Sequence, residues 1–401
     1  MTAWGGRLEN PVSDRLRDPT TTGWVALGLG AFAAFLAIPP IEARSPTWPL
    51  VVGVLAIALG IWTATRGRRK LGWGAVVAGL LGIGLGILAT RSGTGNLEAV
   101  FDATLIDQTF GLATPLVFGA IAGMFAERSG IINIGLEGMM LMGAFFGVYG
   151  ADKGGSWVVG LLIGMASGGL LALVYAYFAI HLRSDQIVGG TAVNFLAVGI
   201  TGYFFQLVYN GNVTGNVPLI PNVHIAGLGH FLENSIGNLN LLTWASFALV
   251  ILAWVFFFKT PLGLRLRACG EHPRAADTVG INVYLVRYCA VVLSGVLVAI
   301  GGVYLSLGPQ GNGTFIFDMT SGKGFIALAA MIFGNWRPAG AFAAALLFGF
   351  SSALALKLQV YSPQASTLFA TLPYVLTLVA VAGVIGRTVP PAAEGKPYAK
   401  Q

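Results

Sequence analysis

Two long apolar runs, residues 241–258 and 283–305, constrain the fold of this chain more than any other feature. About 20 residues at a rise of ~1.5 Å each cross the ~30 Å hydrocarbon core of a bilayer, so each run predicts a transmembrane helix. Composition extends this prediction to the whole chain, because 55% of the residues are hydrophobic and only 10% are charged. The short alternating segments of transmembrane barrels are absent from the sequence. The predicted fold class is therefore all-α, a polytopic helical membrane protein.

The stretch between these runs, residues 261–282, is basic. Its cationic side chains, with one just before it, are Lys259, Arg265, Arg267 and Arg274. Lys and Arg beside membrane spans favour the cytoplasmic side, so this loop is predicted to be cytosolic. Other basic turns fall at residues 66–70, 181–185 and 387–401. Placing all of them inside puts both termini in the cytosol and requires an even number of crossings, about 10 to 12. These loops account for the net charge of +7, so we expect no nucleic-acid binding.

Within the basic stretch, a short helix is predicted to begin at Pro273, which suits the first helical position. Ala275 and Ala276 are strong helix formers, and Gly280 suits a C-terminal cap. A helix of roughly two turns is unstable alone in water, so it must pack against something. Two alternatives are open: a connector that covers the ends of the bundle, or a cytosolic helix on which a partner acts.

Three predicted spans, at about residues 24–40, 50–65 and 71–90, lie in an N-terminal extension over residues 1–108. Residues 109–390 form the predicted transmembrane domain that contains the loop 259–282, and residues 391–401 form a polar cytosolic tail. The further apolar runs of this transmembrane domain are residues 110–150, 157–180, 187–209, 324–334, 338–357 and 367–386.

Two apolar regions are interrupted by polar residues flanked by glycine, at residues 126–138 and 334–340. Each interruption predicts either a tight cytosolic turn between two spans or a break in a helix pair that re-enters without crossing. Their similar design suggests an internal repeat. Interrupted segments in corresponding halves of a transporter indicate a transport site near the bilayer midplane.

Four polar side chains are candidates for the lining of a solute path. Asn133 and Glu137 are four residues apart and are predicted to share a helix face, and Gln186 and Asn194, eight apart, lie near one face of another helix. Polar groups within spans generally face a bundle interior or a water-filled path. Paired amides either recognise a neutral polar solute by donating and accepting hydrogen bonds, or join helices to each other. Both alternatives stay open.

No catalytic constellation is evident in the sequence. The four histidines are scattered over loops, the two cysteines fall in different environments, and no P-loop motif is present. We therefore expect no metal site, no bound cofactor and no ATP hydrolysis by a P-loop of this chain.

Four long segments carry a resemblance to a known family: PLVFGAIAGMFAERSGIINIGLEGMMLMGAFFG, DQIVGGTAVNFLAVGITGYFF, GPQGNGTFIFDMTSGKGFIALAAMIFGNWRP and the ending LPYVLTLV…GKPY. They resemble permease subunits of bacterial ABC importers, a group that includes ribose-type and branched-chain amino-acid permeases. The resemblance covers residues 112–398 and is greatest to the simple-sugar and nucleoside branch. It implies a type II importer-like fold in the bacterial plasma membrane.

The resemblance also implies a coupling helix that docks in a groove of a separate ATPase subunit, where ATP and Mg²⁺ would bind. The positions it implies for this contact are Arg267, Gly270, Glu271, Pro273, Arg274, Ala275, Ala276 and Gly280. Further implied partners are a second related permease and an external lipoprotein that binds the solute.

The leading functional prediction is a nucleoside permease driven by a partner ATPase. A ribose-like sugar permease is the first alternative. The second is an ion-coupled carrier, which would need an intramembrane carboxylate such as that of Glu137.

Overall fold

The computed structural model describes residues 19–35, 47–91, 102–212, 217–225, 227, 233, 235–361 and 389–399. The described residues form helices and turns without a β-sheet, and one isolated bridge pairs Asn222 with Asn240. Seven helices in these ranges are long and apolar enough to cross a membrane. The predicted all-α, polytopic class is therefore confirmed. The span predicted at residues 367–386 lies outside the described residues.

The chain divides into two compact units. The first comprises Met1–Asp102 and Leu354–Gly386, and the second comprises Ala103–Ala353 and Arg387–Gln401. The first unit thus contains most of the predicted N-terminal extension, together with a later segment that the sequence assigned to the transmembrane domain.

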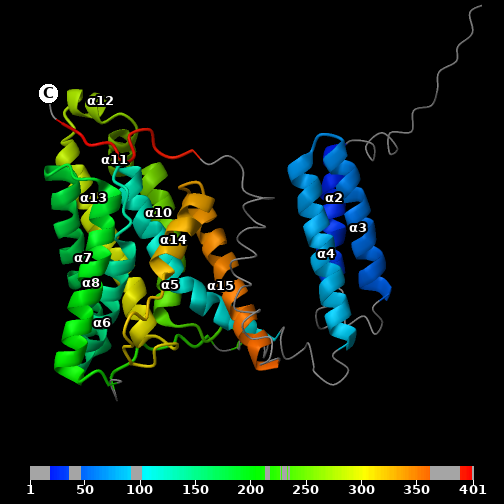
Figure 1. Ribbon diagram of the computed structural model, residues 1–401, viewed down its shortest axis with the longest axis horizontal. Coiled ribbons are helices and arrows are strands. Elements are labelled where there is room, and N and C mark those ends of the chain that lie inside the picture. The colour runs from blue at the N-terminus through cyan, green and yellow to red at the C-terminus, as the bar shows by residue number, and fades with distance from the viewer. Residues whose placement is uncertain are drawn as a thin grey trace, which may run out of the picture. The chain divides into compact units, whose positions relative to one another are not determined.

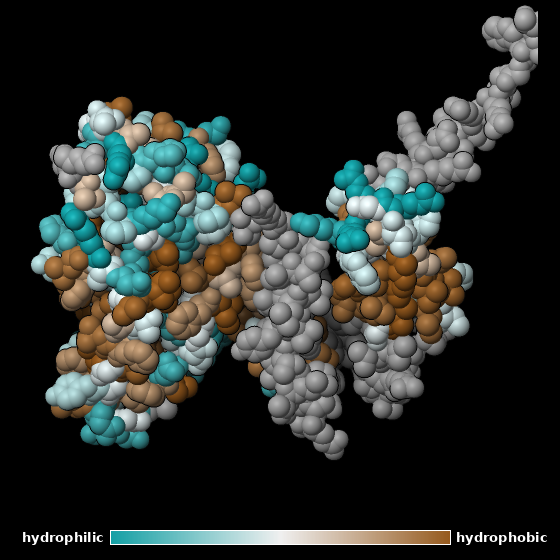
Figure 2. Space-filling view, turned by 45° about the horizontal axis from the view of Figure 1, so that its top comes forward, coloured by the Kyte–Doolittle hydropathy of each residue, from teal (hydrophilic) through white to brown (hydrophobic). Residues whose placement is uncertain are grey.

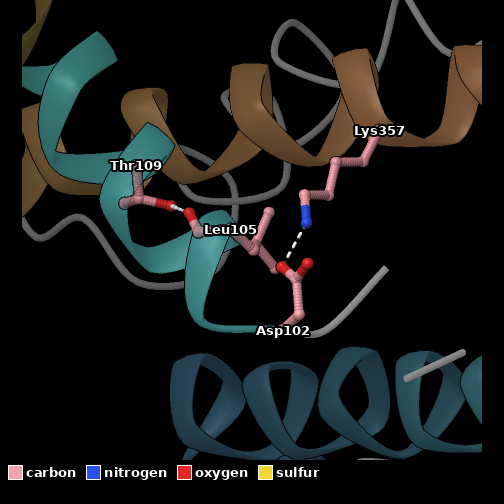
Figure 3. A network of polar contacts seen from close by, with 4 residues as sticks. All are labelled: Asp102, Leu105, Thr109 and Lys357. Atoms are coloured by element: carbon pink, nitrogen blue, oxygen red, sulfur yellow. Dashed lines mark hydrogen bonds and ion pairs between the residues drawn. The ribbon is translucent and has the colours of Figure 1, made fainter. Parts of the chain in front are cut away.

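In the first unit, α3 (Thr47–Thr65) and α4 (Arg69–Arg91) lie where two spans were predicted, and α3 is long and apolar enough to cross a membrane. Helix α2 (Pro19–Phe35) begins five residues before the span predicted at residues 24–40, and residues 36–40 lie outside the described ones. Glycines let α3 and α4 approach closely, because a Cβ added at Gly79 would lie 2.8 Å from the carbonyl oxygen of Gly53. Within the same unit, Lys357 forms an ion pair with Asp102 (Figure 3).

The second unit contains long helices. They are α5 (Ala103–Arg128), α6 (Leu136–Gly154), α7 (Trp157–Ala176), α8 (Gln186–Tyr209), α10 (Leu241–Lys259), α13 (Val283–Leu307) and the first part of α15 (Pro338–Tyr361), which continues into the first unit from Leu354. Longer connections lie between α8 and α10 and after α13. Three shorter helices are α11 (Pro261–Glu271), α12 (Pro273–Thr278) and α14 (Lys323–Phe333), and a π-helical turn (Tyr177–His181) extends α7. Buried side chains of α5, α6 and α13 form the centre of this unit.

An apolar surface band runs across the second unit between two polar ends (Figure 2). Leu170, Phe195 and Leu252 are among the large apolar side chains that remain exposed on its helices. A large exposed apolar surface of this kind indicates contact with lipid or with another protein. It agrees with the assignment of these helices as membrane spans.

The two ends of this unit carry different segments (Figure 1). One end, called the basic end below, carries α11, α12, the first polar turn (residues 129–135), the second polar turn (residues 334–337) and residues 389–399. The opposite end carries the connection between α8 and α10, which the Ile220 N–H joins to the carbonyl of Leu307 at the end of α13.

Helix α14 is only half as long as a membrane span. Its 11 residues extend about 16 Å at ~1.5 Å per residue, against ~30 Å of hydrocarbon. It begins beside the middle of α5, since a Cβ added at Gly119 would meet Ala327, and it ends at the second polar turn. The rest of this crossing is non-helical chain after α13, with Phe315 and Thr320 fully buried. Non-helical backbone at membrane depth is tolerated where protein buries it.

Candidate functional site at the basic end

The basic stretch between α10 and α13 folds as two helices in succession. Thr260 caps α11 by accepting a hydrogen bond from the Gly263 N–H at 3.1 Å, and Pro261 begins the helix. Pro273 then begins α12, the short helix predicted from the sequence. Asn282 caps α13 by accepting from the Leu285 N–H at 3.1 Å. Each local signal is a capping side chain or an N-terminal proline.

The residues proposed for contact with an ATPase divide by burial. Gly270 and Ala276 are buried, Arg267 and Pro273 are half-buried, and the others are exposed: Glu271, Arg274, Ala275 and Gly280. Ala276 packs in a small cluster with Cys269, Val283 and Tyr398. It therefore holds α12 against the protein, and the exposed surface of α12 comes from Arg274, Ala275 and Thr278.

The chain segment after residue 389 packs on these helices. The Ala393 N–H donates to the Gly270 carbonyl at 2.9 Å, and the Ala392 N–H donates to Glu271 Oε2 at 3.2 Å. Further along, the Tyr284 hydroxyl donates to the Tyr398 carbonyl at 3.3 Å. The sequence analysis treated this segment only as a polar tail. Its bonds are mostly through backbone groups, which leave no pattern of residue types.

The end of α5 binds the second polar turn directly, although the two are more than 200 residues apart in sequence. Trp336 Nε1 donates to Glu127 Oε2 at 2.6 Å, and Arg128 Nη2 donates to the Trp336 carbonyl at 2.6 Å. Glu127 also shares a hydrogen bond with Glu394, and burial raises the pKa of the Glu394 carboxyl. The turns and residues 389–399 thus form one connected polar network.

Arg287 stands at the centre of this network. It is 1% exposed, its Nε donates to the Ser129 carbonyl at 3.1 Å, and its Nη1 donates to the Lys396 carbonyl at 3.4 Å. Its guanidinium lies over the ring of Tyr398. Arg287 was not among the predicted site residues, although a charge near the start of an apolar span is a recognisable signal.

The candidate path residues mostly bind the backbone of the first polar turn. Gln186 Oε1 accepts from the Ile132 N–H at 2.8 Å. Asn194 Oδ1 accepts from the Gly138 N–H at 2.8 Å, and its Nδ2 donates to the Ile134 carbonyl at 3.0 Å. Both amides are buried on one side of α8, as their spacing predicted. Of the two alternatives for paired amides, these contacts support the joining of chain segments.

Asn133 and Glu137 do not share a helix face, which corrects the expectation from their spacing. Asn133 lies in the non-helical first polar turn and donates to Ser294 Oγ at 3.0 Å, whereas Glu137 lies in the first turn of α6. Glu137 accepts from the N–H groups of Gly322 and Gly324 at 2.7 and 2.5 Å. Its carboxylate therefore binds the start of the half-length helix α14, where a negative charge is favoured.

An apolar groove of about 1010 Å³ lies between α11 and α13 at the basic end. Leu264, Val279 and Leu285 are among its lining residues, and Val279 is 75% exposed. The groove thus exposes apolar side chains next to the cationic Arg265, and an exposed apolar patch of this kind marks a contact surface for another molecule.

Comparison with known proteins identifies the family. The family model described as the permease component of the branched-chain amino acid transport system matches residues 105–381. The chain is 41% identical to the guanosine ABC transporter permease protein NupQ of Bacillus subtilis, over 76% of this chain and 97% of the relative. It is 39% identical to the nucleoside ABC transporter permease protein NupC of Lactococcus lactis, over 72% and 94%.

The putative glucose ABC transporter permease protein TsgC13 of Haloferax volcanii is 32% identical, over 72% of this chain and 93% of the relative. Bacillus subtilis and Lactococcus lactis each have a second matching permease at 26% identity. No solved structure gives a significant match. The family match begins at α5, so α2, α3 and α4 lie outside it. With a match over most of its length, the chain belongs to the branched-chain amino acid transport system permease family.

Proposed function

We propose that this chain is the membrane-spanning permease subunit of an ATP-driven importer that takes up nucleosides. The observation that carries the proposal is 41% and 39% identity to a guanosine and a nucleoside permease, over nearly the full length of both relatives. The polytopic helical fold supports a transport role, because it provides the membrane-spanning body that such a subunit needs.

The basic end is proposed to be cytosolic and to receive the ATPase subunit. Arg274 and Val279 are exposed there, and the buried Ala276 packs α12 against the rest of the unit. Lys and Arg at the ends of spans favour the cytosolic side. ATP and Mg²⁺ would then bind to the partner, and closure of the ATPase would move α11 and α12 against the two polar turns. Such a movement shifts the helix bundle between outward-facing and inward-facing conformations only if the ATPase makes different contacts with α11 and α12 in these two conformations.

The other partners are proposed to be a second, related permease and an external solute-binding lipoprotein. Two of the organisms that hold the relatives each have a pair of matching permeases, one near 40% identical to this chain and one at 26%. This pattern supports pairing of two different permeases. The chain would lie in the bacterial plasma membrane with both termini in the cytosol.

Uptake by cells that express the complete transporter tests the proposal. The chain, its companion permease, the ATPase and the binding lipoprotein are co-expressed in cells that lack nucleoside uptake, and accumulation of radiolabelled guanosine is measured. We expect accumulation against a gradient that requires ATP hydrolysis by the partner. Accumulation that continues with a hydrolysis-deficient ATPase, driven by a proton gradient, would refute it.

A simple-sugar permease is the second candidate, favoured by the 32% identity to a putative glucose permease. Competition separates the two: excess unlabelled glucose or ribose leaves guanosine uptake unchanged if the solute is a nucleoside. Uptake of labelled glucose that guanosine does not inhibit would favour the sugar instead.

A further inference from the structure

A polar cavity of about 270 Å³ lies at the opposite end of the second unit, away from the basic end. It is lined by the start of α5, the start of α10 and the chain that follows α13. Its volume is just below the roughly 300–1,000 Å³ of pockets that hold drug-sized ligands. The cavity therefore suits one small solute and is too small for a peptide.

The inner wall of the cavity is held by polar groups that bond to each other. The Thr114 hydroxyl donates to Thr243 Oγ1 at 3.0 Å, and Thr243 Oγ1 donates to the Tyr304 hydroxyl at 3.4 Å. Asn240 Nδ2 donates to the Ile220 carbonyl at 3.0 Å and fixes the neighbouring loop. At Gly111 an added Cβ would lie 3.2 Å from Gln310 Nε2, so a side chain at this position would intrude on the cavity.

Four other lining side chains, Asp107, Gln108, Asn238 and Gln310, make no hydrogen bond within the described part of the chain. Gln108, Asn238 and Gln310 are exposed, and Asp107 is half-buried. They converge on one cavity with amide donors, amide acceptors and one carboxylate. A site with this set binds a solute that both donates and accepts hydrogen bonds.

The charge of the lining residues further limits which solutes the cavity can bind. Among the described residues that line it, Asp107 is the single carboxylate, and none is Lys, Arg or His. A carboxylate accepts two hydrogen bonds from adjacent donors, as the two hydroxyl groups of a diol present them. The same charge repels a phosphate, because like charges a few ångströms apart in a partly buried site are costly.

We propose that this cavity is an outer subsite for the transported solute, which is uncharged and rich in hydroxyl and N–H groups. The assignment rests on the proposed function, in which the opposite end faces outward and the solute is a nucleoside. Gln108 and Gln310 bind the solute there, and Asp107 both binds its donors and excludes phosphorylated forms.

The test uses the complete transporter in proteoliposomes with guanosine as the probe, and compares Gln310→Leu, Asp107→Asn and the control Gln206→Leu. Gln206 is an exposed amide on α8, which also ends at the opposite end of the unit, but it does not line the cavity. Loss of one neutral hydrogen bond should raise KM about three- to tenfold in Gln310→Leu, with the maximal rate and basal ATP hydrolysis unchanged. Gln206→Leu should leave KM at the parent value.

For Asp107→Asn, inhibition by a phosphorylated solute is measured, because a purely structural role of Asp107 would not change it. Guanosine monophosphate should inhibit guanosine uptake by this variant and not by the parent, because the repelling charge is gone. If the parent transports guanosine while Gln310→Leu keeps its KM and Asp107→Asn stays insensitive to the monophosphate, the subsite is refuted and the proposed function stands. Gln108→Leu, another exposed position, repeats the KM test if either variant fails to assemble. A parent that does not transport guanosine refutes the proposed function itself.

Discussion

Replacement of Asn194 by Leu tests whether the amides of α8 hold the first polar turn in place. Asn194 makes two buried hydrogen bonds, to the Gly138 N–H at 2.8 Å and to the Ile134 carbonyl at 3.0 Å. Leu fills a similar volume but leaves both backbone groups without this partner. At the ~0.6 kcal/mol average for hydrogen bonds between membrane helices, the loss is about 1 kcal/mol. If each group stays unpaired at a cost of ~2 kcal/mol, it is about 4 kcal/mol.

The assay is equilibrium unfolding of the purified permease in mixed micelles, followed by tryptophan fluorescence as the denaturing detergent increases. Asn194→Leu should lower the free energy of unfolding by about 1–4 kcal/mol. The matched control is Gln206→Leu, which changes an exposed amide of the same helix and should shift it by less than about 0.5 kcal/mol. Equal stability of the two variants would refute the assignment of Asn194 to bonding the turn.

Two further predictions concern the segment 389–399. Because burial raises the pKa of Glu394, the packed segment holds a proton that the released segment loses, so packing weakens as pH rises from ~4.3 toward the raised pKa. After correction for the intrinsic exchange rate at each pH, the protection of its amides should fall over this range in the parent and fall less in Glu394→Gln; an equal fall in both proteins would contradict this. Deletion of residues 391–401 should expose Cys269, which is fully buried and whose pKa burial raises to about 11, so its maleimide labelling should accelerate more than tenfold. The exposed Cys289 is the internal control, and unchanged labelling of Cys269 would show that the segment does not cover it.

Much of the fold follows from the sequence because a membrane span has a strong local signal. Runs of apolar residues located α3, α7, α8, α10 and α13 with small errors at their ends. Pro273 and the alanines located α12, and the spacing of Gln186 and Asn194 put both amides on one side of α8. Each of these predictions depends on neighbours in sequence.

The features that the sequence did not predict depend on contacts between distant segments. Asn133 was placed on a helix face with Glu137 because the two are four residues apart, but Asn194 and Gln186 stabilise a non-helical turn there. The apolar run at residues 324–334 located α14, but its length alone did not show that non-helical chain completes the crossing or that Gly322 and Gly324 bond to Glu137.

The packing of residues 389–399 had no signal either, because backbone groups make most of its bonds. The first interruption is a non-helical stretch between α5 and α6, and its Asn133 reaches Ser294 in the middle of α13. The second is a turn that follows a half-length helix, so the irregular crossing lies before it. The internal repeat stays a prediction.

The central claim, that the stretch between α10 and α13 receives the ATPase, is tested most directly by crosslinking in membranes. Val279→Cys places a thiol at a position that is 75% exposed, in a background where Cys289→Ser removes the exposed native thiol. Asn212→Cys, exposed at the opposite end, is the control. We predict that Val279→Cys crosslinks to the ATPase subunit with a yield that changes on addition of ATP, and that Asn212→Cys does not. Crosslinking from Asn212→Cys alone, or labelling of Val279→Cys by an impermeant reagent outside intact cells, would contradict the account.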